Sequence, residues 1–126
     1  MTGPTILRIL VGVHLVWTVL LTPLALEPRP FSSFTPLAFV SLAMIFTTVT
    51  LDVVAFVIVG TRTRTAATLV AIGGLLFVPP FIVDQLGLFS TIPAPTQITI
   101  LEIAALATQL ALLYLGMRLR RGSPAG

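Results

Sequence analysis

The length, composition and charge of the chain exclude most classes of soluble protein. It has 126 residues, enough for one domain; 56% are hydrophobic and only 9% are charged, whereas about a quarter are charged in soluble domains. Cysteine is absent, which rules out disulfides, thiolate metal sites and cysteine nucleophiles. The positive charge comes from arginines at the ends of apolar runs, a pattern of membrane orientation and not of nucleic-acid binding.

The first apolar run extends from Thr5 to about Leu26 and predicts a membrane-spanning helix. It is too long for the apolar core of a signal peptide and lacks a cleavage site of small residues, so we expect it to be retained. The stretch Glu27-Pro28-Arg29-Pro30 ends this helix, because closely spaced prolines favour extended backbone. A second helix is predicted from about Pro36 to Gly60, with proline in its first turn and glycine at its end.

A third helix is expected from about Thr65, after an arginine-bearing turn. Gly73-Gly74 allows another backbone to approach closely. Pro79-Pro80 removes two amide donors at a depth where water cannot replace them, so we expect the helix to kink or break there. The segment from Phe81 to Phe89 follows that point, and Ser90 to Pro95 is predicted to be a loop.

A fourth helix is predicted from about Thr96 to Met117, and residues 122–126 are predicted to be a disordered tail. The expected fold is all-α, with a single four-helix transmembrane domain over residues 1–121. By the positive-inside rule, the arginines place both termini in the cytoplasm if the protein lies in a bacterial inner membrane. The arginines assigned to the cytoplasmic side are Arg8, Arg62, Arg64, Arg118, Arg120 and Arg121.

Every predicted helix carries an ionisable or strongly polar side chain, which is costly inside a bilayer and points to a functional site. At about 1.5 Å of rise per residue, His14 and Asp52 lie at similar depths from the same end, so we expect them to share one layer. Trp17, Phe46 and Phe56 are expected to form walls nearby. The structural alternative is that His14 and Asp52 only form hydrogen bonds between helices.

A second polar layer is expected nearer the opposite end of the bundle. Asp84 and Gln85 lie close to the outer end of the third helix, and Glu102 lies near the start of the fourth. Gln109 follows Glu102 by two helical turns and therefore shares its face, which we expect to point into the bundle. The same stripe also includes Ala105, Leu112 and Gly116.

These groups are suited to general acid and base catalysis. A carboxyl group in a medium of low dielectric resists ionisation, and beside an imidazole it forms an acid and base pair. We therefore expect the protein to bind or transform a lipophilic small molecule by isomerase, cyclase or hydrolase chemistry, without a metal or other cofactor. The predicted catalytic residues are His14, Asp52, Asp84 and Glu102. The predicted substrate-binding residues are Trp17, Phe56, Gln85 and Gln109.

Two other functions fit the same sequence. Small size and alanine pairs that permit close helix packing are typical of a non-catalytic accessory subunit in a larger membrane complex. Buried acids also relay protons, which suits a proton-coupled transporter; such a transporter would act as a homodimer, because four short helices enclose little volume. The expected partners are the lipid bilayer, a lipophilic small molecule and other membrane chains, and no nucleic acid.

Two segments resemble a known family. They are Arg8-Ile9-Leu10-Val11-Gly12 in the first helix, and Asp52 followed by Gly60-Thr61-Arg62-Thr63-Arg64-Thr65-Ala66-Ala67. Both are similar to the DoxX-like group of small four-helix membrane proteins, in which an acid precedes a glycine, an arginine-bearing turn and an alanine-rich third helix. The resemblance covers about half of the chain and implies a membrane subunit associated with redox partners.

Overall fold

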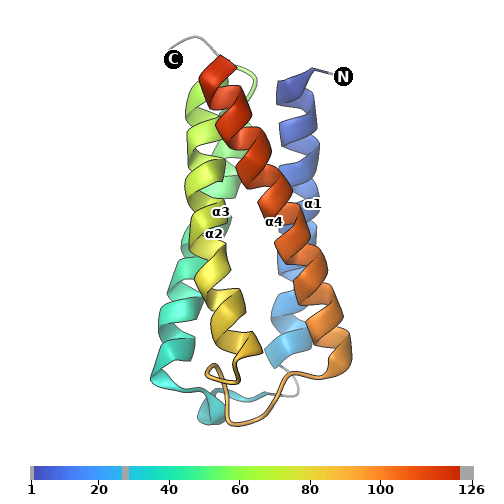
Figure 1. Ribbon diagram of the computed structural model, residues 1–126, viewed down its shortest axis with the longest axis vertical. Coiled ribbons are helices and arrows are strands. Elements are labelled where there is room, and N and C mark those ends of the chain that lie inside the picture. The colour runs from blue at the N-terminus through green and yellow to red at the C-terminus, as the bar shows by residue number, and fades with distance from the viewer. Residues whose placement is uncertain (1, 27–28, 123–126) are drawn as a thin grey trace.

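A computed structural model describes residues 2–26 and 29–122, which form helices joined by short connections and contain no strand (Figure 1). The long helices are α1 (Gly3–Leu26), α2 (Pro36–Ile58), α3 (Thr63–Gln85) and α4 (Thr96–Gly122). A short 3₁₀ helix, η1 (Phe31–Ser33), lies between α1 and α2. The predicted all-α fold of four long helices is confirmed.

The helices run alternately up and down. In Figure 1 the start of α1, the α2–α3 turn and the end of α4 lie at the upper end, and the α1–α2 and α3–α4 connections lie at the lower end. α3 packs against both α2 and α4, and α4 also packs against α1, whereas the contact between α1 and α2 is smaller. At the lower end the two connections meet, with Ser33 Oγ 2.8 Å from Ser90 Oγ.

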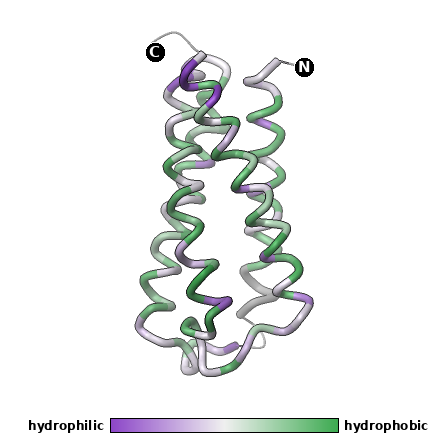
Figure 2. Tube along the Cα trace, viewed as in Figure 1, coloured by the Kyte–Doolittle hydropathy of each residue, from purple (hydrophilic) through white to green (hydrophobic). Residues whose placement is uncertain are grey.

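All four long helices are long and apolar enough to cross a membrane. In the most apolar window of each helix, 22% of the residues are buried inside the protein in α1, in α2 and in α4, whereas 39% are buried in α3. α3 is therefore the most enclosed helix. Figure 2 shows hydrophobic residues along all four helices and a hydrophilic segment at the upper end of α4. An apolar outer surface of this extent fits a multi-pass membrane protein.

α3 differs from the expected helix at its lower end. It continues through Pro79 and Pro80 without interruption, so the expected break is absent, and a kink stays a prediction. The helix ends at Gln85 and does not reach Phe89. Gly87 explains this end, because its φ of +72° lies in the left-handed region and its N–H bonds to Asp84 O at 3.0 Å.

α4 extends beyond its expected end at Met117 and reaches Gly122. Leu119 explains the extension, since it packs against the hydrophobic core and against Gly3 at the start of α1. Gly122, assigned to the expected disordered tail, is therefore helical. The rest of that tail, residues 123–126, and the proposed helix-ending pair Glu27-Pro28 lie outside the described residues.

The inward stripe predicted on α4 is confirmed. Gln109 and Gly116 are buried, together with the apolar members of the stripe. A Cβ atom at Gly116 would lie 2.7 Å from the carbonyl oxygen of Ala67, closer than real Cβ atoms approach other atoms. Glycine at position 116 therefore lets the backbones of α3 and α4 come together.

Candidate functional site

The inner polar layer begins with a contact between α1 and α2. His14 Nδ1 lies 2.8 Å from Asp52 Oδ2, and both side chains are fully buried. His14 continues the buried row of Leu7 and Val11 on α1, and Asp52 follows the buried Thr48 by one turn of α2. The layer predicted from helix rise is therefore present, and helix periodicity turns both polar residues toward the bundle axis.

Gln109 on α4 completes this layer and is also fully buried. Its Nε2 atom lies 2.9 Å from His14 Nε2 and 3.4 Å from Asp52 Oδ2. The same Nε2 atom also lies 3.1 Å from His14 Nδ1, so the amide group contacts both nitrogens of the imidazole ring. The layer thus links three helices through one imidazole ring.

Two polar atoms of the inner layer face α3. Asp52 Oδ1 and Gln109 Oε1 have no hydrogen-bond partner within the described part of the chain. They lie against the paired glycines of α3: a Cβ atom would be 3.4 Å from Asp52 Oδ1 at Gly73, and 3.5 Å from Gln109 Oε1 at Gly74. The close approach predicted for these glycines is confirmed, and it makes room for polar groups from two other helices.

The outer polar layer lies at the lower end of the bundle. Arg29, in the α1–α2 connection, donates from Nη1 to Asp84 Oδ1 at 2.6 Å and from Nη2 to Asp84 Oδ2 at 3.3 Å. The guanidinium group also lies over the ring of Phe89, 5.1 Å from its centroid. The side chains of Arg29 and Asp84 are only 2% and 9% exposed. This enclosed bidentate pair fastens the α1–α2 connection to the end of α3.

Glu102 on α4 approaches the same pair. Its Oε1 atom lies 4.0 Å from Arg29 Nη2, and its Oε2 atom accepts a hydrogen bond from Gln85 Nε2 at 3.0 Å. The outer layer predicted from Asp84, Gln85 and Glu102 therefore exists, with Arg29 as an additional member. The predicted acids occupy two separate layers, and no group of three His, Cys, Asp or Glu side chains among the described residues is arranged to hold a metal ion.

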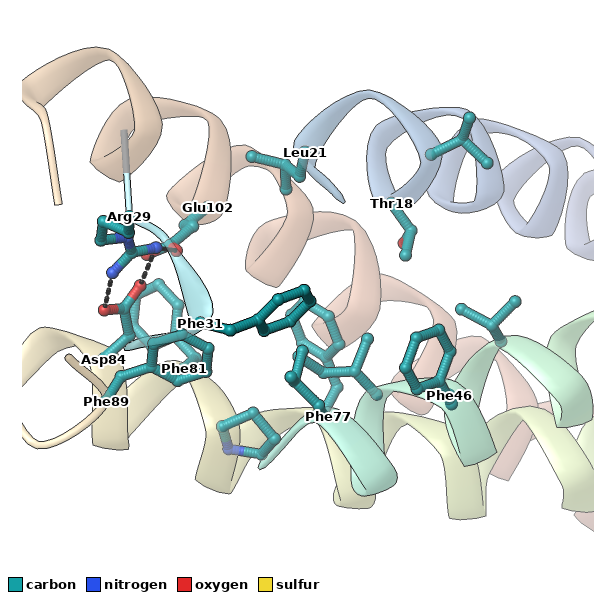
Figure 3. A pocket seen from close by; sticks show the side chains of 15 residues that line it. Thr18, Leu21, Arg29, Phe31, Phe46, Phe77, Phe81, Asp84, Phe89 and Glu102 are labelled. Carbon is teal, nitrogen blue, oxygen red and sulfur yellow. Dashed lines mark hydrogen bonds and ion pairs between the residues drawn. The ribbon is translucent and has the colours of Figure 1, made fainter. Parts of the chain in front are cut away.

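A cavity of about 330 Å³ lies between the two layers (Figure 3). The charged side chains of the outer layer lie at one end, and Thr18 lies toward the other. Thr18 Oγ1 is 3.4 Å from His14 Nε2, and Phe77, another lining residue, packs edge-on against the His14 ring with centroids 5.2 Å apart. The cavity therefore reaches the inner layer through Thr18 and Phe77, while His14 itself remains buried.

The walls of the cavity are apolar, and aromatic rings are prominent among them. Its lining comes from α1, α2, α3, the two lower connections and α4. The lining phenylalanines are Phe31, Phe46, Phe77, Phe81 and Phe89. Helices distant in sequence thus enclose one space that is apolar along its length and charged at one end.

The other predicted wall residues lie elsewhere. Trp17 and Phe56 are absent from the lining of this cavity, and Phe56 is 40% exposed, with its ring 5.7 Å from the Arg8 guanidinium carbon. On sequence alone, Arg29 is placed only in the stretch that ends the first helix, and Thr18 is not singled out. The position of Arg29 is nevertheless a signal in the sequence, because this arginine is expected at the same end of the bundle as Asp84 and Glu102.

Comparisons with family models, curated proteins and solved structures return no match to this chain. The fold and the cavity define the protein as a bundle of four membrane-type helices with two internal polar layers. The resemblance to the DoxX-like group stays a prediction.

Proposed function

We propose that this protein binds a lipophilic small molecule in the cavity between its two polar layers. The observation that carries the proposal is the chemistry of the cavity, whose walls are apolar and whose charged groups gather at one end. This combination suits a molecule that is mostly hydrocarbon with one polar end. The volume of about 330 Å³ lies near the lower limit of small-molecule sites, about 300–1,000 Å³, which favours a small ligand.

The ligand enters sideways from the hydrocarbon of the bilayer. Three lining residues, Val19, Phe31 and Phe46, are 67%, 63% and 62% exposed, so the cavity has a mouth on the outer surface. Val19 belongs to α1 and Phe46 to α2, the neighbouring helices that share the smaller contact. An apolar mouth between these helices admits a molecule already dissolved in lipid.

Within this proposal the two polar layers have different tasks. The outer layer meets the polar end of the ligand, because Arg29, Asp84 and Glu102 border the cavity directly. The inner layer fixes the helices around it, because His14 and Asp52 are fully buried. Chemical transformation of the bound molecule by these acids stays a prediction, and the groups placed to exchange protons with a ligand are Asp84 and Glu102.

The orientation of the bundle is part of the same proposal. Both termini lie in the cytoplasm of a cell with an inner membrane, because arginine concentrates at the upper end. Arg8 reaches that end, with Nη2 3.3 Å from the Cβ position of Gly60. The mouth and the outer layer then lie in the outer half of the bilayer.

The proposal also includes a kink of α3 at Pro79-Pro80. Neither proline has an N–H group to donate within the helix, and Pro80 lines the cavity.

Two alternatives from the sequence, an accessory subunit of a redox complex and a dimeric proton-coupled transporter, stay predictions. Native mass spectrometry of protein released gently from its membrane separates the accessory subunit from the ligand-binding proposal. We expect the wild type to carry a small lipophilic mass. Stoichiometric partner chains without any small molecule would instead identify an accessory subunit.

A cavity-filling variant makes this measurement specific. Leu42 lines the cavity, so Leu42→Trp fills part of its volume and should remove the bound mass. Leu37→Trp is the matched control, because Leu37 lies on the same helix, is 46% exposed and is absent from the lining. Equal retention of the bound mass by both variants would place the ligand outside the cavity and contradict the proposal.

A further inference from the structure

The charged end of the cavity has more carboxyl groups than cationic groups among its lining residues. One guanidinium group, that of Arg29, faces the carboxyl groups of Asp84 and Glu102. Arg29 makes its short bidentate contact with Asp84, at 2.6 and 3.3 Å, whereas Glu102 lies 4.0 Å away, beyond hydrogen-bonding distance. Arg29 therefore makes its close contacts with Asp84 and only a longer ion pair with Glu102, so two carboxyl groups share one guanidinium group.

The hydrogen bond that Glu102 accepts from Gln85 does not bring a second cation to its carboxyl group. Gln85 donates to Oε2 at 3.0 Å, but an amide carries no net charge. The Glu102 side chain is 17% exposed and borders the cavity, so a charge placed inside the cavity can approach it. A carboxylate in an apolar surrounding is strongly stabilised by a cation at contact distance.

The aromatic walls also favour a positively charged ligand in the cavity. Each of the five lining phenylalanines presents a π system whose face attracts cations. Phe89 already holds one cation in this way, because the Arg29 guanidinium lies 5.1 Å from its ring centroid. An anion, in contrast, would meet two carboxyl groups and the negative faces of the rings, while the one guanidinium is already engaged.

We propose that the ligand of this cavity is a lipophilic organic cation, with its ammonium-type group beside Glu102 and its hydrocarbon part among the phenylalanines. The inference rests on the proposed function, because it names the chemical class of the molecule that the cavity binds. Charge complementarity at Glu102 and cation–π contact with the walls together distinguish this class from neutral and anionic lipophiles.

Two probes of the same shape test the charge requirement. Phenyltrimethylammonium carries a positive nitrogen where tert-butylbenzene has a neutral carbon. Binding is measured by equilibrium dialysis of the full chain in phosphatidylcholine nanodiscs, with binding to empty nanodiscs subtracted. We expect the wild type to bind the cation about tenfold more tightly than its neutral counterpart.

Glu102→Gln removes the charge while keeping the size of the side chain, and we expect it to abolish the preference for the cation. Phe81→Leu is a second variant, which keeps the wall apolar but removes a ring at the charged end of the cavity and should reduce the preference. Phe39→Leu is its control, since Phe39 is a phenylalanine of α2 outside the lining and should leave the preference unchanged.

The outcomes separate this inference from the function on which it rests. Equal binding of both probes to the wild type, or an unchanged preference in Glu102→Gln, overturns the cation assignment but leaves a lipophile-binding cavity. Failure of both probes to bind overturns the cavity function as well. Loss of binding in Phe39→Leu together with Phe81→Leu would show that the rings act through overall folding, which also overturns the assignment.

Discussion

His14 Nδ1 and Asp52 Oδ2 lie 2.8 Å apart in the middle of the bundle, although 38 positions separate the two residues in the sequence. Both side chains have 0% exposure, so neither can exchange this partner for water. The contact joins α1 to α2, the neighbouring helices that pack least closely. It therefore bridges the side of the bundle where the cavity opens.

The unfolding free energy lost when both partners of this contact are removed should be smaller than the sum of the losses caused by the two single substitutions. We expect a double-mutant cycle of His14→Ala and Asp52→Ala to give a coupling energy of about 1 to 2 kcal/mol, because each single change leaves a buried polar group unpaired. Reversible unfolding in mixed micelles, followed by circular dichroism, measures it. Thr50→Ala is the control, since Thr50 is exposed and bonds only within α2. Additive effects would contradict a direct interaction.

The close approach of α3 and α4 predicts that a single methyl group at Gly116 is destabilising. Gly116→Ala places a Cβ atom 2.7 Å from the Ala67 carbonyl oxygen, so the helices must separate, and the free energy of unfolding should fall by about 1 to 3 kcal/mol. Gly122→Ala has no atom within 4 Å of the new Cβ and should change little. Both variants are compared by the same unfolding measurement, and equal stability of the two would show that the helices are not in close contact at Gly116.

The Arg29–Asp84 pair should behave as an enclosed ion pair. Arg29→Met leaves the Asp84 carboxyl group without its two guanidinium donors, and we expect a loss of about 3 kcal/mol in unfolding free energy. Arg29→Met combined with Asp84→Leu removes the isolated charge and should recover most of that loss. Thermal unfolding in detergent compares the variants. A double variant less stable than either single one would argue against a direct pairing.

The absence of cysteine makes the orientation directly testable with single-cysteine variants. Thr61 lies in the α2–α3 turn and Thr91 in the α3–α4 connection, and both are exposed. A maleimide that cannot cross the membrane should label Thr91→Cys in intact cells and Thr61→Cys only after permeabilisation. The opposite pattern would place the mouth of the cavity in the cytoplasmic half of the bilayer.

Hydropathy and helix rise, both local properties of the sequence, predicted much of this architecture. Apolar runs of sufficient length gave the four helices, and short connections made neighbouring helices antiparallel. Depth along each helix then assigned His14 and Asp52 to one layer and Asp84, Gln85 and Glu102 to another, and the contacts agree with both assignments. Periodicity also predicted that Gln109 faces inward.

The tertiary structure alone decided how each helix is rotated about its axis and which residues meet. Phe46 and Phe56 lie on the same helix, yet Phe46 lines the cavity and Phe56 lies against Arg8. Arg29 joins the site because the α1–α2 connection folds back onto the end of α3. Such contacts depend on side chains distant in the sequence, and their energies exist only once the helices are packed, so no local pattern encodes them.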